Sequence, residues 1–170
     1  VVECGGTATT LNPSTFGRLP VVFFDHDPSC LPANSLCVTH DSASTGKMAA
    51  RELMEGGAVN FAFVPYPERR FWGEERERGF VAALALNGHG CHVFSSRLSP
   101  KDSTRWQRKL REFLKGLPKP CAIFAANDYT AAEVLAAAEF ISVKVPDELS
   151  VIGVDDAVSI CERTEPTLSS

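Results

Sequence analysis

The chain has 170 residues, of which 44% are hydrophobic and 22% charged, and its formal net charge is −4. A chain of this length can bury a substantial core, and the negative charge argues against direct binding of nucleic acid or of an anionic membrane surface. No apolar run is long enough to span a bilayer.

Apolar runs that predict buried strands alternate with segments that predict helices. In chain order, the predicted strands are residues 19–28, 59–64, 91–96, 120–126 and 149–154, and the predicted helices are residues 42–57, 72–86, 102–118 and 128–140. Strands that are apolar on both faces and alternate with helices predict a parallel sheet covered on each side. With right-handed crossovers this is a doubly wound α/β sheet, and such sheets bind ligands at the carboxyl ends of their strands.

The cysteines give no sign of a metal site or of disulfides. All six are scattered along the chain, with no CxxC pair and no zinc-like spacing to the four histidines. Cys91 and Cys121 lie within apolar runs, where a free thiol behaves as a small hydrophobe. This pattern favours a reducing cytoplasm, and the sequence predicts neither a metal nor a cofactor.

Three predicted strands are followed by polar groups that would share one edge of the sheet. Arg76 lies in the first turns of the helix after the second strand, and Asn127 and Asp155 directly follow the fourth and fifth strands. These side chains offer a rigid donor fork, a mixed donor and acceptor, and a pair of acceptors. Sugar hydroxyls both donate and accept, so the set matches a sugar, and Trp72, Phe71 or Tyr129 can supply a flat wall for its ring.

Each of these residues also has a simpler interpretation. Asn127 or Asp128 can cap the helix that follows, and Arg76 belongs to the charge run EERER, which usually marks a solvated helical face. Asp155 can be only a loop residue after a strand. Taken singly, each residue favours the simpler interpretation, whereas their common position at one sheet edge favours a binding site.

Two segments resemble a known family. The segment IFAANDYTAAEVLAAAEFISVKVPDELSVIGVDDAVSICERTEPTLSS and the helix start ERERGF resemble the lactose-repressor type of effector domain, which has the periplasmic-binding-protein-like (type I) fold. The resemblance covers essentially residues 19–170 and implies that the chain is mainly the second lobe of such a domain. It implies a C-terminal remnant of the first lobe in residues 1–42, the second lobe in 43–157, and a return crossover toward the first lobe in 158–170.

The resemblance also implies roles for individual residues. In the wider family the arginine, the Asn of ND and the first Asp of DD contact the effector, which correspond to Arg76, Asn127 and Asp155. Asp128 and Asp156 would then be structural or capping residues.

The stretches RRFWGEERERGF and IGVDDAVSICE resemble the subgroup of xylose-operon regulators, which join a sugar-sensing domain to a C-terminal AraC-type helix-turn-helix domain. This implies a pentose effector, with D-xylose favoured, and a cytoplasmic homodimer without a membrane partner. Operator DNA would be bound through a domain absent from this chain. The alternative is a periplasmic sugar-binding protein of a transporter. A sugar-modifying enzyme is a third class, but the chain has no GxSxG serine or other evident nucleophile.

Overall fold

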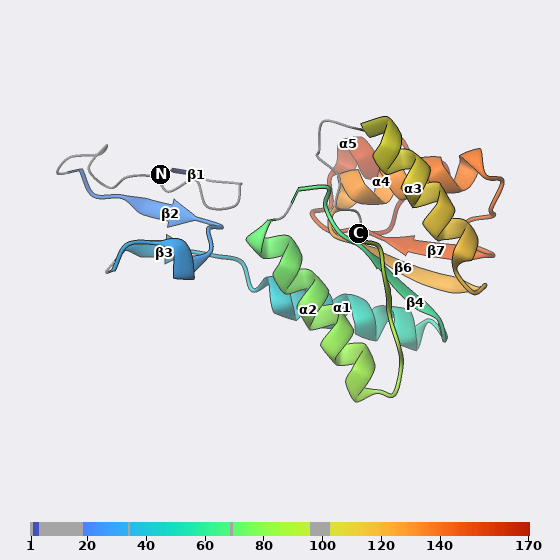
Figure 1. Ribbon diagram of the computed structural model, residues 1–170, viewed down its shortest axis with the longest axis horizontal. Coiled ribbons are helices and arrows are strands. Elements are labelled where there is room, and N and C mark those ends of the chain that lie inside the picture. Colours follow the sequence, from blue (N-terminus) through green and yellow to red (C-terminus); the bar gives the residue numbers. More distant parts are fainter. Residues whose placement is uncertain (1, 4–18, 34, 69, 96–102) are drawn as a thin grey trace.

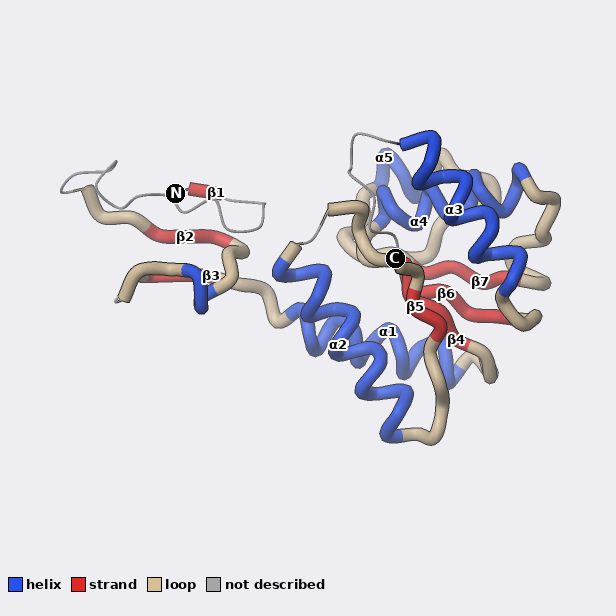
Figure 2. Tube along the Cα trace, in the orientation of Figure 1, coloured by secondary structure: helices blue, strands red, loops and turns tan. Residues whose placement is uncertain are grey.

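The computed structural model describes residues 2–3, 19–33, 35–68, 70–95 and 103–170. These described residues form two parallel sheets, one of three strands and one of four, with the three-stranded sheet at the N-terminal end (Figure 1). The long helices gather around the four-stranded sheet (Figure 2). The predicted α/β class with a parallel sheet is therefore confirmed.

The four-stranded sheet has a doubly wound order. Its strands are β4 (Phe61–Val64), β5 (His92–Val93), β6 (Cys121–Ala125) and β7 (Leu149–Ile152), all parallel and arranged β5-β4-β6-β7. From β4 the chain moves outward to β5 and then crosses back to β6 and β7. The winding direction therefore reverses between β4 and β6, and this reversal is where sheets of this kind open a crevice for ligands.

Helices cover both faces of this sheet because its central strands are apolar on both sides. Helices α1 (Ser42–Glu55) and α2 (Phe71–Leu86) pack on one face, and α3 (Ser103–Gly116) and α4 (Asp128–Phe140) pack on the other. In β4, Phe61 and Phe63 belong to the core under α1 and α2, whereas Ala62 and Val64 belong to the core under α3 and α4. All four side chains are fully buried, as the uninterrupted apolar run predicts.

Helices α1 and α2 touch backbone to backbone through two glycines. A Cβ atom on Gly46 would lie 2.1 Å from the carbonyl oxygen of Arg76, and one on Gly79 would lie 2.0 Å from that of Ala43. No side chain fits at either position without moving a helix. Since Gly46 lies against the backbone of Arg76 itself, this contact fixes where the first turns of α2 stand.

The smaller sheet consists of β1 (Val2–Glu3), β2 (Val22–Phe24) and β3 (Leu36–Val38), which are parallel and arranged in that order. Strand β2 lies within a predicted strand, but β3 was not predicted, nor was the short helix α5 (Val158–Cys161). Elements of three or four residues are too short to show a hydrophobic period. Among the helices of the described ranges, none has the length and apolar character needed to cross a bilayer.

Candidate functional site

Arg76 and Asp155 meet at the carboxyl end of the four-stranded sheet. Arg76 is nearly buried, and one of its terminal NH₂ groups donates to the carbonyl oxygen of Ala126, just beyond β6, at 2.6 Å. The other donates to Oδ1 of Asp155, just beyond β7, at 3.3 Å. The guanidinium thus links the ends of β6 and β7 from a helix that follows β4. The predicted convergence of these two residues is observed, at the point where the winding direction reverses.

Asp155 is held as a partly exposed carboxylate. Its side chain is 49% exposed, against 9% for that of Arg76. Partial burial raises the pKa of the Asp155 carboxyl above its ordinary value of 3.8, and the Arg76 guanidinium opposes that rise. Its backbone has φ of 109°, a left-handed conformation that is costly for a residue other than glycine. An acceptor with one face on a cation and the other open to solvent is suited to binding a ligand hydroxyl.

Asn127 is the N-cap of α4, so the simpler interpretation holds for this residue at least in part. Its Oδ1 accepts from the backbone N–H of Thr130 at 2.9 Å and from the Thr130 hydroxyl at 2.8 Å. Both lone pairs of Oδ1 are then occupied, and Nδ2 is the group that can contact a ligand. Of the roles predicted for Asn127, the structure contains the cap, while ligand contact stays a prediction.

Trp72 packs against Arg76, so this face of its ring is not free to form a wall for a sugar. The guanidinium carbon of Arg76 lies 4.7 Å from the centre of the Trp72 ring, a cation–π contact. Tyr66 packs on the same ring with a centroid distance of 5.7 Å. The indole therefore positions the arginine, and whether it also touches a sugar stays a prediction.

Asp128 has the structural role expected of it. The residue is fully buried, and its Oδ2 accepts from the backbone N–H of Ala157 at 2.8 Å and faces the Cys161 thiol at 3.5 Å. Its own N–H donates to the carbonyl oxygen of Val154 at 3.0 Å. Asp128 thus ties the end of β6 to the loop after β7 and holds Asp155 in place. The neighbouring Asp156 donates its backbone N–H to the hydroxyl of Ser170 at 2.9 Å.

An interaction at the ends of the smaller sheet's strands, between Asp25 and His40, was not predicted. Asp25, directly after β2, accepts the backbone N–H of His40 at 3.1 Å and pairs with Nδ1 of the same histidine at 2.7 Å. A positive charge on His40 lowers the pKa of Asp155. The run VVFFD ends in a carboxylate as VIGVD does, and this shared pattern could have revealed Asp25.

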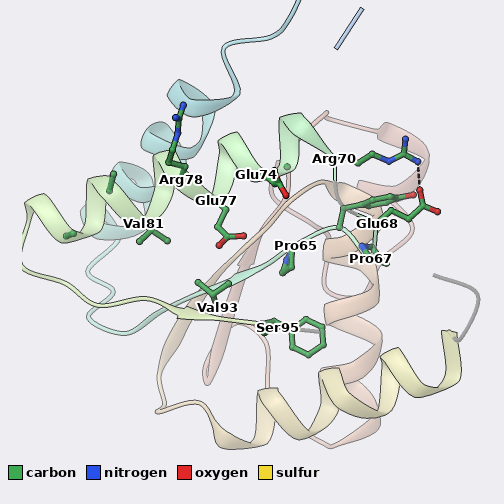
Figure 3. A pocket seen from close by; sticks show the side chains of 15 residues that line it. Pro65, Pro67, Glu68, Arg70, Glu74, Glu77, Arg78, Val81, Val93 and Ser95 are labelled. Atoms are coloured by element: carbon green, nitrogen blue, oxygen red, sulfur yellow. Dashed lines mark hydrogen bonds and ion pairs between the residues drawn. The ribbon is translucent and has the colours of Figure 1, made fainter. Parts of the chain in front are cut away.

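A wide cavity on another part of the molecule does not coincide with these residues. It has a volume of about 780 Å³ and lies between α2 and β5, with Glu74 and Glu77 projecting from the helix and Val93 opposite (Figure 3). None of Arg76, Asn127, Asp155 and Trp72 lines it. In the described part of the chain, no cluster of His, Cys, Asp and Glu is suited to hold a metal ion.

The fold and this site define an effector-binding type of domain, and comparison with known families agrees. Residues 50–170 match the family of periplasmic binding protein-like domains, and the chain belongs to that family.

The relatives are regulators of transcription. The chain is 29% identical over 136 residues to a xylose operon regulatory protein of Haemophilus influenzae, covering 78% of this chain and 35% of that protein. It is 26% identical over 172 residues to the HTH-type transcriptional regulator DegA of Bacillus subtilis, covering 99% of this chain and 49% of the relative. The chain therefore spans half or less of the length of these two proteins.

Among solved structures, the xylose-binding transcription activator xylR is similar, with a TM-score of 0.73 and 27% identity. The match covers 91% of this chain and 41% of that one. This likeness covers a larger share of the chain than residues 50–170.

Proposed function

We propose that this chain is part of the sugar-sensing domain of a transcription regulator and that its effector is a pentose, with D-xylose favoured. The observation that carries the proposal is the convergence of Arg76 and Asp155, with Asn127 alongside, at the carboxyl end of the four-stranded sheet. The similarity to regulators of xylose operons supports the choice of sugar.

In this proposal Asp155 accepts from two neighbouring hydroxyls of the sugar, and Arg76 and Nδ2 of Asn127 donate to its oxygens. Buried cations such as Arg76 are costly unless they are paired, so the ion pair with Asp155 keeps the site formed before the sugar arrives. A sugar hydroxyl can then enter between two groups that are already oriented, which lowers the ordering cost of binding.

The remaining parts of the proposal concern the whole protein. The smaller sheet would belong to a first lobe in residues 1–42, the larger to the second lobe in 43–157, and residues 158–170 would return toward the first lobe. Sugar binding would close the lobes of a homodimer and alter how it presents a separate DNA-binding domain to the operator. A cytoplasmic location is supported by the five described cysteines, which are all free thiols.

The test uses the natural gene product that contains this chain. A thermal-shift screen of common sugars would identify the ligand, and calorimetric titration would then compare variants. We expect Asp155→Asn to lower the affinity for D-xylose at least about tenfold, equivalent to about 1.4 kcal/mol, because one acceptor becomes a donor. The melting temperature without sugar should fall only slightly, since Asp155 is half exposed and Arg76 keeps its hydrogen bond to Ala126 and its contact with Trp72.

The matched control is Asp156→Asn, which alters an adjacent exposed aspartate that also has a positive φ, of 48°. Arg76→Met should abolish the sugar response. Its control is Arg78→Met, which alters an exposed arginine on the same helix. Normal D-xylose binding by Asp155→Asn would show that the pair of aspartates is structural and that the proposed site is wrong.

A further inference from the structure

A second cavity, of about 240 Å³, opens beside the proposed sugar site. It lies between the loop after β4, the first turns of α3 and the first turn of α4. Three aromatic residues line it, one from each of these segments, namely Tyr66, Trp106 and Tyr129. Its polar lining includes Gln107, Thr130 and Glu133.

Two of the residues that line the cavity, Tyr66 and Thr130, are linked by contacts to the proposed sugar site. Tyr66 packs on Trp72, and Trp72 in turn lies under the guanidinium of Arg76. On the other wall, Thr130 donates twice to the Oδ1 of Asn127. Thr130 therefore separates the cavity from Asn127, and Tyr66 and Trp72 separate it from Arg76, so the cavity lies close to a ligand held by these residues.

The walls of the cavity differ in how firmly they are fixed. Trp106 is 6% exposed and is held edge-on by Phe94 at a centroid distance of 5.7 Å. Tyr129, in contrast, is 65% exposed, so its ring is accessible to a ligand. Gln107 donates to Glu133 across α3 and α4 and so closes one side with a polar rim.

This combination matches one further sugar ring. Aromatic faces bind the apolar faces of a pyranose, and the rim of carboxamide, hydroxyl and carboxylate can bind its hydroxyls. Pockets for drug-sized ligands enclose roughly 300–1,000 Å³, so the smaller volume here leaves room for one ring and not for a longer chain. The carboxylate of Glu133 disfavours an acidic sugar, because like charges repel at short range.

We infer that this cavity is a subsite for the second ring of a neutral disaccharide whose first ring occupies the Arg76–Asn127–Asp155 site. The inference rests on the proposed function, because it takes the first ring to lie there. It extends the effector class from a free pentose to a pentose disaccharide.

Calorimetric titration of the natural gene product would test this with D-xylose, methyl β-D-xyloside and β-1,4-xylobiose. The methyl glycoside carries the same linkage without a second ring. We expect xylobiose to bind at least about tenfold more tightly than methyl β-D-xyloside. Tyr129→Ala should remove most of that preference and leave the affinity for D-xylose within about twofold, because the ring is exposed and supports no core.

Phe140→Ala is the matched control, since it removes another exposed aromatic ring from the opposite end of α4. It should leave all three affinities unchanged. Xylobiose binding no tighter than methyl β-D-xyloside, with D-xylose still bound, would overturn the subsite and leave the proposed function intact. Equal loss of D-xylose and xylobiose in Tyr129→Ala would also overturn it. No binding of any of the three sugars would refute the proposed function itself.

Discussion

The two sheets of this molecule are both parallel, yet they are stabilised differently. In the four-stranded sheet, every side chain of β4 and β6 is buried. In the three-stranded sheet, β3 exposes Leu36 to 67% and Val38 to 53%, and the one buried side chain of β2 is Phe23. The difference shows that a parallel sheet gains a core only where helices or other segments cover both of its faces.

The largest difference between the two sheets is expected for a substitution at the centre of the larger sheet. Phe124 of β6 is fully buried and packs on Phe63 and Phe80, with centroid distances of 5.4 Å and 5.0 Å. Phe124→Ala should lower the free energy of unfolding by about 3–5 kcal/mol, through lost burial and the cavity left behind. Val38→Ala in the smaller sheet should change it by no more than about 0.5 kcal/mol.

Urea unfolding followed by tryptophan fluorescence would measure both changes, because Trp72 and Trp106 pack against the larger sheet. A loss for Val38→Ala as large as that for Phe124→Ala would mean that the smaller sheet has a core of its own.

A smaller effect is expected at the contact between α1 and α2. Gly79→Ala gains helix propensity of up to about 1 kcal/mol. However, the new methyl group would lie 2.0 Å from the carbonyl oxygen of Ala43, so the helices must separate. Overpacking of this kind costs about 1–3 kcal/mol, and we expect a net loss of stability in urea unfolding.

Gly116→Ala is the control for this substitution, since a Cβ there would meet nothing within 4 Å. It should be neutral or slightly stabilising. If Gly79→Ala proved as neutral as Gly116→Ala, the close approach of the two helices would not be a constraint on the fold.

The smallest effect is expected at Asp155 and His40. Burial raises the pKa of Asp155 in the folded protein, so the ionised carboxylate does not stabilise the fold. On acidification this carboxylate therefore takes up a proton at a pH above its ordinary pKa of 3.8. Sugar binding that needs the carboxylate should therefore be full at neutral pH and weaken as pH falls through that raised pKa. The charged groups that act on Asp155 are Arg76 in α2, Asp128 at the start of α4 and His40 in the loop after β3.

Calorimetric titration of D-xylose between neutral and acidic pH would follow this loss. In His40→Gln the midpoint should move to higher pH, because a protonated histidine lowers the pKa of Asp155. A midpoint that does not change in His40→Gln would show that His40 has no effect on the pKa of Asp155.

Much of the fold could be read from local patterns. The sequence predicted α4 with the bounds that the structure has, and it predicted α2 within one residue of its start. Both helices have a sharp signal at their ends, such as the Asn127 cap. The burial of β4 on both faces followed from an unbroken apolar run, since only a strand covered on two sides tolerates one. Strand β3 was missed because three residues with two exposed side chains carry no such pattern.

For the site, the sequence determined which residue types stand at the ends of strands, and hence that a sugar-like ligand was a reasonable expectation. The tertiary structure decided how they are used. Arg76 and Asp155 are 79 positions apart, and their pairing depends on the strand order and on the close approach of α1 to α2. Asp128 and Asp155 each follow a strand and look alike in the sequence. Only packing decided that Asp128 is buried and Asp155 half exposed. Such choices depend on contacts between distant segments, which no local pattern contains.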